Sequence, residues 1–468
     1  MRRLSIAILS GLVAFVAACG APPASQPQAA GRATVFEGAR LITGDEAPPI
    51  EDSAFVVQDG RFTSVGRRGD LQAPDGAARV DLTGKTVMPG IIETHAHLGY
   101  WKDLKPSAEN FTRENVLSDL QRLAYHGVAA VLSMGADRRE IAWPLRDELR
   151  ANPRPDTPIY LAAGGFAAPK GGPFTPLDEA VRVITNEEDV RKEIQELVAK
   201  KADFVKVWQD SRRVLMPRPL IEFLIAEAHR NSLRVVAHVH ALPDFKHLLG
   251  AGLDAFAHPT WRQTEVEPVD DELIALFKAH PSVPIMAGFW TPRHEIYGAR
   301  PYWLDDPLLA ETFTPVEIKA LENPQTPSDA PQAWASGPVP RSMQRLKAAG
   351  VLFVLGTDMG GGLSREHDPT PAYFGWSSHI EMESMVKAGL TPREVITAAT
   401  RNSARFLGLD QLGTVASGRN ADFLVLDANP LDNIANTRRI ARVYLRGGQL
   451  DRAGLRTQLK GVNSTQSR

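Results

Sequence analysis

Between residues 87 and 410, short apolar segments alternate with helical patterns. The apolar segments have the length of buried strands, and amphipathic stretches such as 187–201, 218–231 and 341–349 separate them. Strands that alternate with helices favour parallel β-α units, so this region predicts an α/β fold with a (β/α)8 TIM barrel. The predicted strands span residues 87–93, 127–133, 158–163, 203–208, 234–239, 253–257, 283–287 and 351–356.

Different patterns occupy the rest of the folded body. Short β-type runs fill residues 33–86 and return at 411–452, and a polar tail covers 453–468. Within the barrel region, residues 289–340 form the largest insertion, which is rich in Pro, Trp and Tyr. We expect this insertion to act as a lid over the barrel mouth.

The N-terminus has the pattern of an export signal. Arg2 and Arg3 precede an apolar run that ends at Cys19, and residues 1–19 resemble a bacterial lipoprotein signal with Cys19 as the lipidated residue. Residues 20–32 are rich in Ala, Pro and Gln and predict a flexible tether. This organisation predicts a lipid-anchored protein of the bacterial cell envelope, and the alternative is an ordinary secretory signal on a soluble secreted or periplasmic protein.

Cys19 is the one cysteine of the chain, which excludes an intramolecular disulfide framework and a multi-cysteine metal site. With 53 Lys and Arg against 55 Asp and Glu, the net charge of −2 gives no reason to expect nucleic acid as a partner. We expect membrane contact through the lipid anchor alone. The sequence does not indicate an oligomeric state.

Four predicted strands end in side chains that bind metals. Side chains alternate along a strand, so His95 and His97 point to the same side, at the end where barrels carry their active sites. The other strand ends of this kind carry His238, His258 and Asp358. His240 shares the face of His238 and leaves open which of the two would bind a metal.

Lys206 lies within an apolar strand, where a charged amine is costly to bury. It could reach solvent or a carboxylate from the strand end. Alternatively, it could be neutralised by CO2 as a carbamate, whose two oxygens can bridge two cations.

Together these motifs resemble the amidohydrolase superfamily, and the resemblance runs from about residue 33 to 450. The branch that looks most similar includes imidazolonepropionase-related enzymes and metal-dependent prolidases with a modified lysine. The residues that carry the resemblance are 88–97 (MPGIIETHAH), Lys206, His238, His258, 356–358 (GTD), 391–400 (TPREVITAAT) and 413–423 (GTVASGRNADF).

The resemblance implies that the two β-type ends join in one small β-sandwich beside the barrel. It also implies a site for two divalent ions. His95, His97 and Asp358 would bind the first ion, His238 and His258 the second, and a carboxylated Lys206 with a hydroxide would bridge both. His238, the histidine that closes the apolar strand, is the family's ligand, which leaves His240 to contact substrate or to support the ligands. Zinc suits this ligand set, although manganese, iron, cobalt and nickel remain open.

Aromatic residues follow several predicted strand ends. Tyr100, Trp208 and Trp261 are among them, and as a group they would wall a pocket for an apolar part of a substrate. For any one of them, ordinary packing of loops onto the barrel is the alternative.

The sequence therefore predicts a binuclear metal-dependent hydrolase of C–N bonds in amides or cyclic amides, which acts on a small-molecule substrate through a metal-bridging hydroxide. Asp358 is the expected catalytic residue, because its carboxylate can accept a proton and pass it to the leaving group. The main alternative is a prolidase-type metallo-dipeptidase acting on dipeptides or N-acyl amino acids. A single-metal deaminase and a non-enzymatic solute-binding lipoprotein are further alternatives. The substrate itself is not determined by the sequence.

Overall fold

The computed structural model describes most of the chain between residues 33 and 462. The described ranges are 33–103, 105–173, 176–210, 213–259, 269–288, 302–313, 318–319, 338–361 and 374–462. The predicted signal at 1–19, the tether at 20–32 and most of the insertion at 289–340 lie outside these ranges, so those interpretations stay predictions.

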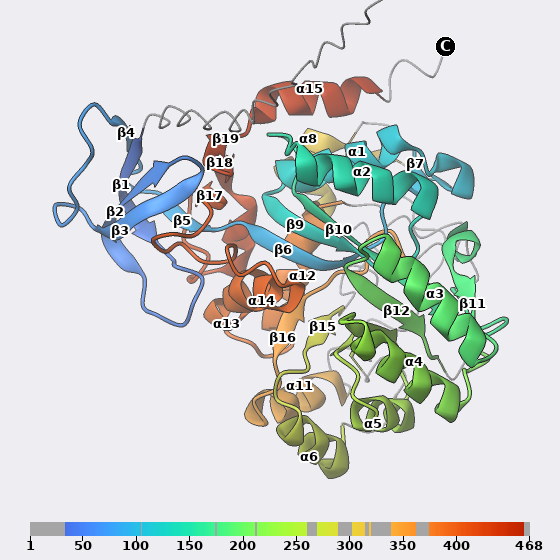
Figure 1. Cartoon of the computed structure of the whole chain (residues 1–468). Helices are drawn as coiled ribbons and strands as arrows, with labels where there is room; N and C mark the ends of the chain where they lie inside the picture. The colour runs from blue at the N-terminus through green and yellow to red at the C-terminus, as the bar shows by residue number, and fades with distance from the viewer. Residues whose placement is uncertain are drawn as a thin grey trace, which may run out of the picture. The chain divides into compact units, whose positions relative to one another are not determined.

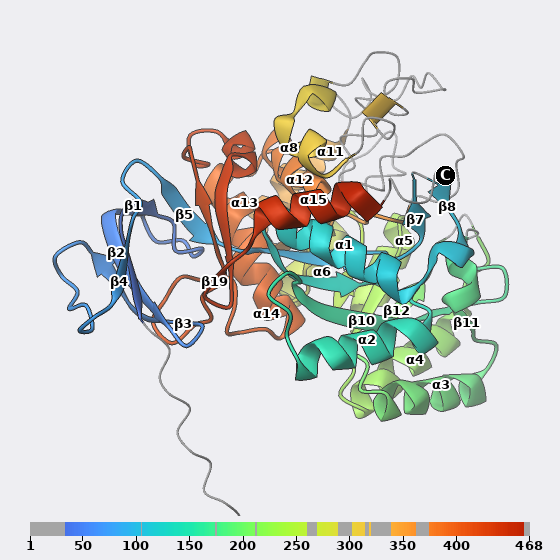
Figure 2. The same ribbon diagram turned by 90° about the horizontal axis from the view of Figure 1, so that it is seen from above.

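The predicted barrel is confirmed. Its strands are parallel, follow one another in chain order, and are covered on the outside by helices (Figures 1 and 2). They are β6 (Ile91–Ala96), β9 (Val128–Ser133), β10 (Ile159–Ala167), β12 (Phe204–Trp208), β13 (Val235–His238), β14 (Ala255–Phe256), β15 (Ile285–Ala287) and β16 (Phe353–Leu355). A short strand, β11 (Arg182–Val183), pairs with β10 beside this path.

The helices follow from amphipathic sequence and local capping. In α3, for example, Val190, Ile194 and Leu197 are buried on one face, and the Asn186 side chain caps the first turn by accepting from the amide of Asp189. The longer helices of the barrel region are α1 (Arg113–Tyr125), α2 (Arg139–Ala151), α3 (Glu187–Ala199), α4 (Arg218–Arg230), α5 (Leu242–Gly250), α6 (Asp271–Ala279), α11 (Pro338–Ala348) and α12 (Trp376–Lys387). Shorter elements and the last helix are β7 (Trp101–Lys102), β8 (Lys105–Pro106), α8 (Pro307–Thr312), α13 (Pro392–Thr397), α14 (Ser403–Leu407) and α15 (Arg452–Val462).

Both ends of the described chain join in a second, eight-stranded sheet, as expected. The two ends meet where β5 pairs antiparallel with β17, with Val87 opposite Val425. Aromatic rings fill the core of this sheet, and the Phe423 ring stacks on Tyr444 at a centroid distance of 4.4 Å. The strands are β1 (Thr34–Leu41), β2 (Ile50–Gln58), β3 (Arg61–Arg67), β4 (Ala78–Asp81), β5 (Thr86–Pro89), β17 (Phe423–Leu426), β18 (Ile440–Leu445) and β19 (Gly448–Gln449).

The predicted strand at 87–93 needs a correction, because the structure divides it at Gly90. The segment before Gly90 belongs to the small sheet as β5, and the barrel strand β6 begins at Ile91. The Gly90 amide donates to the Asp422 carbonyl oxygen at 2.9 Å, and a Cβ at this position would lie 2.7 Å from the Ala129 Cβ. Close packing where the chain passes from the small sheet into the barrel thus requires glycine. His95 lies within β6, and His97 follows the end of this strand directly.

None of the helices in the described ranges is both long enough and apolar enough to cross a bilayer.

Two other histidines are buried together, His126 just before β9 and His379 in α12. The His379 Nε2 donates to the His126 carbonyl oxygen at 2.9 Å, and the His126 Nε2 lies 3.1 Å from the Thr312 hydroxyl. Burial lowers the pKa of His126 well below its usual value and lowers the pKa of His379 to about 3. Both rings are therefore neutral in the folded protein at neutral pH.

We expect this pair to make the protein acid-sensitive. As the pH falls from about 6.5 towards 4, the unfolded chain protonates these histidines and the folded chain does not, so the free energy of unfolding decreases. A His379→Asn variant should be less stable at pH 7, but its unfolding free energy should fall less steeply, by up to about 1.4 kcal/mol per pH unit. Urea unfolding at several pH values between 4 and 7 measures both slopes, and equal slopes would contradict the assignment.

Candidate metal centre

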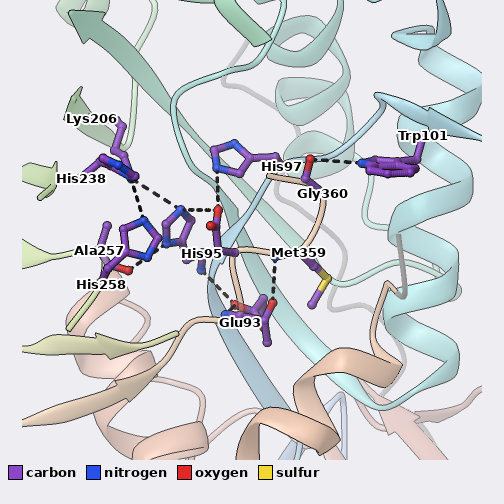
Figure 3. Close-up of polar contacts among 12 residues, drawn as sticks. Glu93, His95, His97, Trp101, Lys206, His238, Ala257, His258, Met359 and Gly360 are labelled. Carbon is purple, nitrogen blue, oxygen red and sulfur yellow. Dashed lines mark hydrogen bonds and ion pairs between the residues drawn. The ribbon is translucent and has the colours of Figure 1, made fainter. Parts of the chain in front are cut away.

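Two groups of ligand-type side chains lie at the carboxyl ends of the barrel strands. One consists of His95, His97 and Asp358, and the other of His238, His240 and His258; within each group the ligand atoms lie within 4.8 Å of one another. The two groups adjoin, because the ring centroids of His95 and His258 are 5.0 Å apart. Figure 3 shows the His95 ring between the rings of His97 and His258.

The first group has the spacing of ligands that share one ion. The Asp358 Oδ1 lies 3.3 Å from the His95 Nε2 and 3.2 Å from the His97 Nε2. Two atoms bound tetrahedrally to one zinc ion are about 3.3 Å apart. The other ring nitrogen of His95, Nδ1, faces the Ala257 carbonyl oxygen at 3.2 Å, which can only accept. The proton therefore belongs on Nδ1, and the lone pair on Nε2 faces the carboxylate.

The second group brings the ends of β13 and β14 together. The His258 Nε2 lies 2.9 Å from the His238 Nδ1, and the His238 Nε2 lies 3.3 Å from the Asp210 Oδ2. His240 is also buried, with its ring centroid 4.7 Å from that of His238 and 5.1 Å from that of His258. The structure therefore brings His240 into the group, as well as the expected His238.

The buried position of these histidines keeps them in the form that binds metals. Burial lowers the pKa of His95 well below its usual value, lowers that of His97, and lowers that of His238 to about 4. At neutral pH the rings are therefore uncharged, and neutral imidazole is the ligating form. The donor set of neutral imidazoles and one carboxylate fits divalent cations such as zinc.

Lys206 is fully buried on β12, next to His95 of the first group. Its Nζ lies 3.5 Å from the His95 Nε2 and 5.4 Å from the centre of the Trp208 ring. Burial lowers the pKa of Lys206 to about 7, while the Asp358 charge acts in the opposite direction. Gly135 packs against this side chain with φ +83°, and a Cβ there would lie 2.4 Å from the Lys206 Cβ. A substantial fraction of the amine is thus neutral at pH 7, the form that reacts with CO2.

A buried carboxylate, Glu93, joins the first barrel strand to the last. Its Oε1 accepts from the amides of His95 at 3.0 Å and Thr357 at 2.9 Å, and its Oε2 accepts from the Ser378 hydroxyl at 3.0 Å. Burial raises the pKa of Glu93 to about 7 against the opposing effect of these hydrogen bonds. Its role was not predicted from the sequence, although an acidic residue within the predicted buried strand was the available signal.

Two backbone hydrogen bonds also join the end of β6 to the turn after β16, and they orient Asp358 towards the histidines. The Asp358 amide donates to the His95 carbonyl oxygen at 2.8 Å, and the His97 amide donates to the Met359 carbonyl oxygen at 2.7 Å. Asp358 has φ +57°, a left-handed conformation that is uncommon outside glycine. The Trp101 indole donates to the Gly360 carbonyl oxygen at 3.2 Å and so supports the turn that holds this conformation (Figure 3).

The predicted aromatic wall is described only in part. Tyr100 is buried, its hydroxyl donates to the Ala136 carbonyl oxygen at 2.6 Å, and its ring packs on Phe111. Trp208 ends β12 beside Lys206, and Trp261 lies outside the described residues. These contacts give Tyr100 a packing role and leave Trp208 as the aromatic residue next to the site.

The chain is similar in sequence to several known enzymes. Residues 339–450 match the model of the Amidohydrolase family. The chain is 24% identical over 421 residues to a 5-methylthioadenosine/S-adenosylhomocysteine deaminase of Halalkalibacterium halodurans, covering 84% of this chain and 85% of that protein. It is 24% identical over 417 residues to an imidazolonepropionase of Deinococcus radiodurans, covering 86% and 92%.

Solved structures share the fold. A Xaa-Pro dipeptidase with bound methionine in its active site superposes with a TM-score of 0.67 at 19% identity, covering 89% of this chain and 99% of that one. The similarity extends over almost the whole of that chain, so it includes the barrel and the sheet beside it.

Removal of the Glu93 carboxylate should weaken the contact between β6 and the residues that follow β16, and so lower the stability of the protein. In Glu93→Ala, two buried amides lose their acceptor, and each such loss costs about 1–3 kcal/mol, so we expect a loss of roughly 3 kcal/mol in the free energy of unfolding. Glu93→Gln keeps an amide oxygen in the same place and should stay within about 1 kcal/mol of wild type. Urea unfolding of the metal-free proteins tests this, and equal stability of Glu93→Ala and Glu93→Gln would refute it.

Proposed function

We propose that this chain, a relative of the amidohydrolase superfamily, hydrolyses C–N bonds in amides or cyclic amides with the help of two divalent metal ions. The observation that carries the proposal is the adjoining pair of ligand groups with Lys206 buried beside them, its Nζ 3.5 Å from the His95 Nε2. A single-ion site would not need the second group or a lysine in this position.

The two groups would hold the ions through different residues. His95, His97 and Asp358 would bind one ion, and His238 and His258 the other. The neutral amine of Lys206 would add CO2 and release one proton, and the resulting carbamate would carry one negative charge and offer one oxygen to each ion. When bound, such ions polarise the carbonyl of the substrate and lower the pKa of an attacking water molecule.

Asp358 would move the proton in this reaction. Its carboxylate follows the carboxyl end of β16, the end at which barrels of this kind carry their active sites. It would accept a proton as the water attacks and donate that proton to the nitrogen that leaves. Because both Glu93 and the Asp358 amide tie this turn to β6, the carboxylate is oriented before the substrate binds.

A prolidase-type activity on dipeptides or N-acyl amino acids is the second candidate. The specific observation in its favour is the shared fold with a Xaa-Pro dipeptidase over nearly the full length of that chain. Both candidates cleave a C–N bond at a carbonyl carbon, and they differ in the group on either side of that bond.

The metal content of the protein tests the binuclear site. Wild type should bind about two equivalents of a divalent ion, whereas Lys206→Ala should lose metal and regain part of it with small carboxylic acids such as acetate. Lys170→Ala removes an exposed lysine and serves as the control that keeps the full metal content. One equivalent in wild type would favour a single-metal deaminase, no metal would favour a solute-binding protein, and normal metal in Lys206→Ala would reject the bridging role.

A substrate screen tests the reaction. Metal-replete protein should hydrolyse at least one compound among dipeptides, N-acyl amino acids and lactams, and the preferred class would decide between the two candidates. A preference for lactones, in which a C–O bond is cleaved, would count against both. Asp358→Asn should lower kcat for that compound by about 100-fold or more, because the amide cannot carry the proton. A loss of less than tenfold would count against the proposed role of Asp358.

A further inference from the structure

We infer that Asp210 is a positioning residue of the second ligand group, which holds the ring of His238 so that its Nδ1 faces the metal ion. The inference rests on the proposed function, since it concerns how one of the two ions is bound. It assigns a role to a residue that neither the motifs nor the strand-end pattern single out.

The hydrogen bond between Asp210 and His238 determines which nitrogen of the ring is free to bind. Asp210 is buried two residues beyond the end of β12, and its Oδ2 lies 3.3 Å from the His238 Nε2. An ionised carboxylate can only accept, so the proton of the neutral ring belongs on Nε2. The lone pair is then on Nδ1, the nitrogen 2.9 Å from the His258 Nε2.

The relative orientation of the rings favours His238 over His240 as the partner of His258. A metal ion lies in the plane of each imidazole that binds it. Two rings can therefore share an ion where their planes cross near both nitrogens or coincide, and stacked rings are poorly placed to do so. The planes of His238 and His258 meet at 83°, whereas those of His240 and His258 are nearly parallel, at 22° with centroids 5.1 Å apart. His238 and His258 can therefore converge on one ion, and His240 stacks beside them.

The segment that carries Asp210 is held firmly against β13. The Gln209 amide donates to the His238 carbonyl oxygen at 2.8 Å, and the Gln209 side chain bonds both the amide and the carbonyl of Met216, at 3.1 and 3.0 Å. The Arg213 amide donates to the Asp210 carbonyl oxygen at 2.8 Å, and the Arg213 Nε lies 4.0 Å from the Asp210 Oδ2. These contacts hold the Asp210 carboxylate in place as an acceptor beside the His238 ring.

Loss of this acceptor should weaken one ion and spare the other. Partners that orient a ligating histidine through its second nitrogen typically contribute 10- to 100-fold to metal affinity. In Asp210→Ala the His238 ring can rotate or exchange its tautomer, and the second group loses its preset geometry. The first group keeps the hydrogen bonds from the amides of His95 and Thr357 to Glu93, which do not involve Asp210.

The test is a zinc titration of metal-free protein in competition with a chromophoric chelator, which gives the number of ions and the Kd of each. Asp210→Ala should bind its first ion as wild type does and its second ion 10- to 100-fold more weakly. Asp210→Asn, whose amide oxygen can still accept from Nε2, should show a smaller shift. The control is Asp137→Asn, which changes a buried carboxylate that accepts from the Tyr160 hydroxyl and is not in either ligand group, and both of its Kd values should equal those of wild type.

The outcomes separate the two proposals. If wild type binds two ions and Asp210→Ala and Asp210→Asn bind both of them with unchanged Kd, the role of Asp210 is overturned and the binuclear site stands. If wild type binds fewer than two ions, the binuclear site is overturned and the role of Asp210 with it. Equal weakening of both ions in Asp210→Asn would point to a general effect on the fold and would also overturn the positioning role.

Discussion

The closure of the barrel between its first and last strands is the constraint on which the site depends. His95 and Asp358 are more than 260 residues apart in the chain, and they meet because β6 and β16 close at their carboxyl ends through Glu93 and the backbone bonds beside it. The small sheet contributes by stopping β5 at Gly90, which sets where β6 begins and hence where its histidines lie. Ligand geometry here is therefore a property of the whole fold.

Burial gives these ligands their chemistry as well as their positions. A lysine and several histidines in an apolar barrel would be costly if they were charged, and their pKa values fall for that reason. A neutral amine is the form that reacts with CO2, and a neutral imidazole is the form that binds divalent cations. The desolvation that opposes burial of charge therefore also favours the protonation states that such a site needs. Ions bound by these groups would in turn stabilise the folded chain, because the unfolded chain has no preformed site.

The sequence predicted those features that depend on local pattern. Two local signals were enough to select His95, His97, His238, His258 and Asp358: the alternation of side chains along strands and the position of each residue at a strand end. The division at Gly90 was missed because the apolar residues on both sides were read as one strand, although Pro89-Gly90 is a dipeptide typical of turns and marks where the chain passes from one sheet to the other. Glu93 and Asp210 were also missed, because they act through hydrogen bonds to residues distant in the chain. Glu93 accepts from Thr357 and Ser378, and Asp210 contacts His238.

Glu93 and Asp210 point to a common physical logic in this barrel. An imidazole or carboxylate at a strand end can rotate about its side-chain bonds. The strand therefore fixes the position of the Cα atom but not the direction of the side chain's lone pair. In the first group, Glu93 fixes the backbone at His95, and the Ala257 carbonyl fixes the His95 ring. In the second group, Asp210, two residues beyond β12, would fix the ring of His238 on β13. The rings of His95 and His238 are thus oriented from elements other than their own strands, which ties the direction of their lone pairs to correct packing of neighbouring strands.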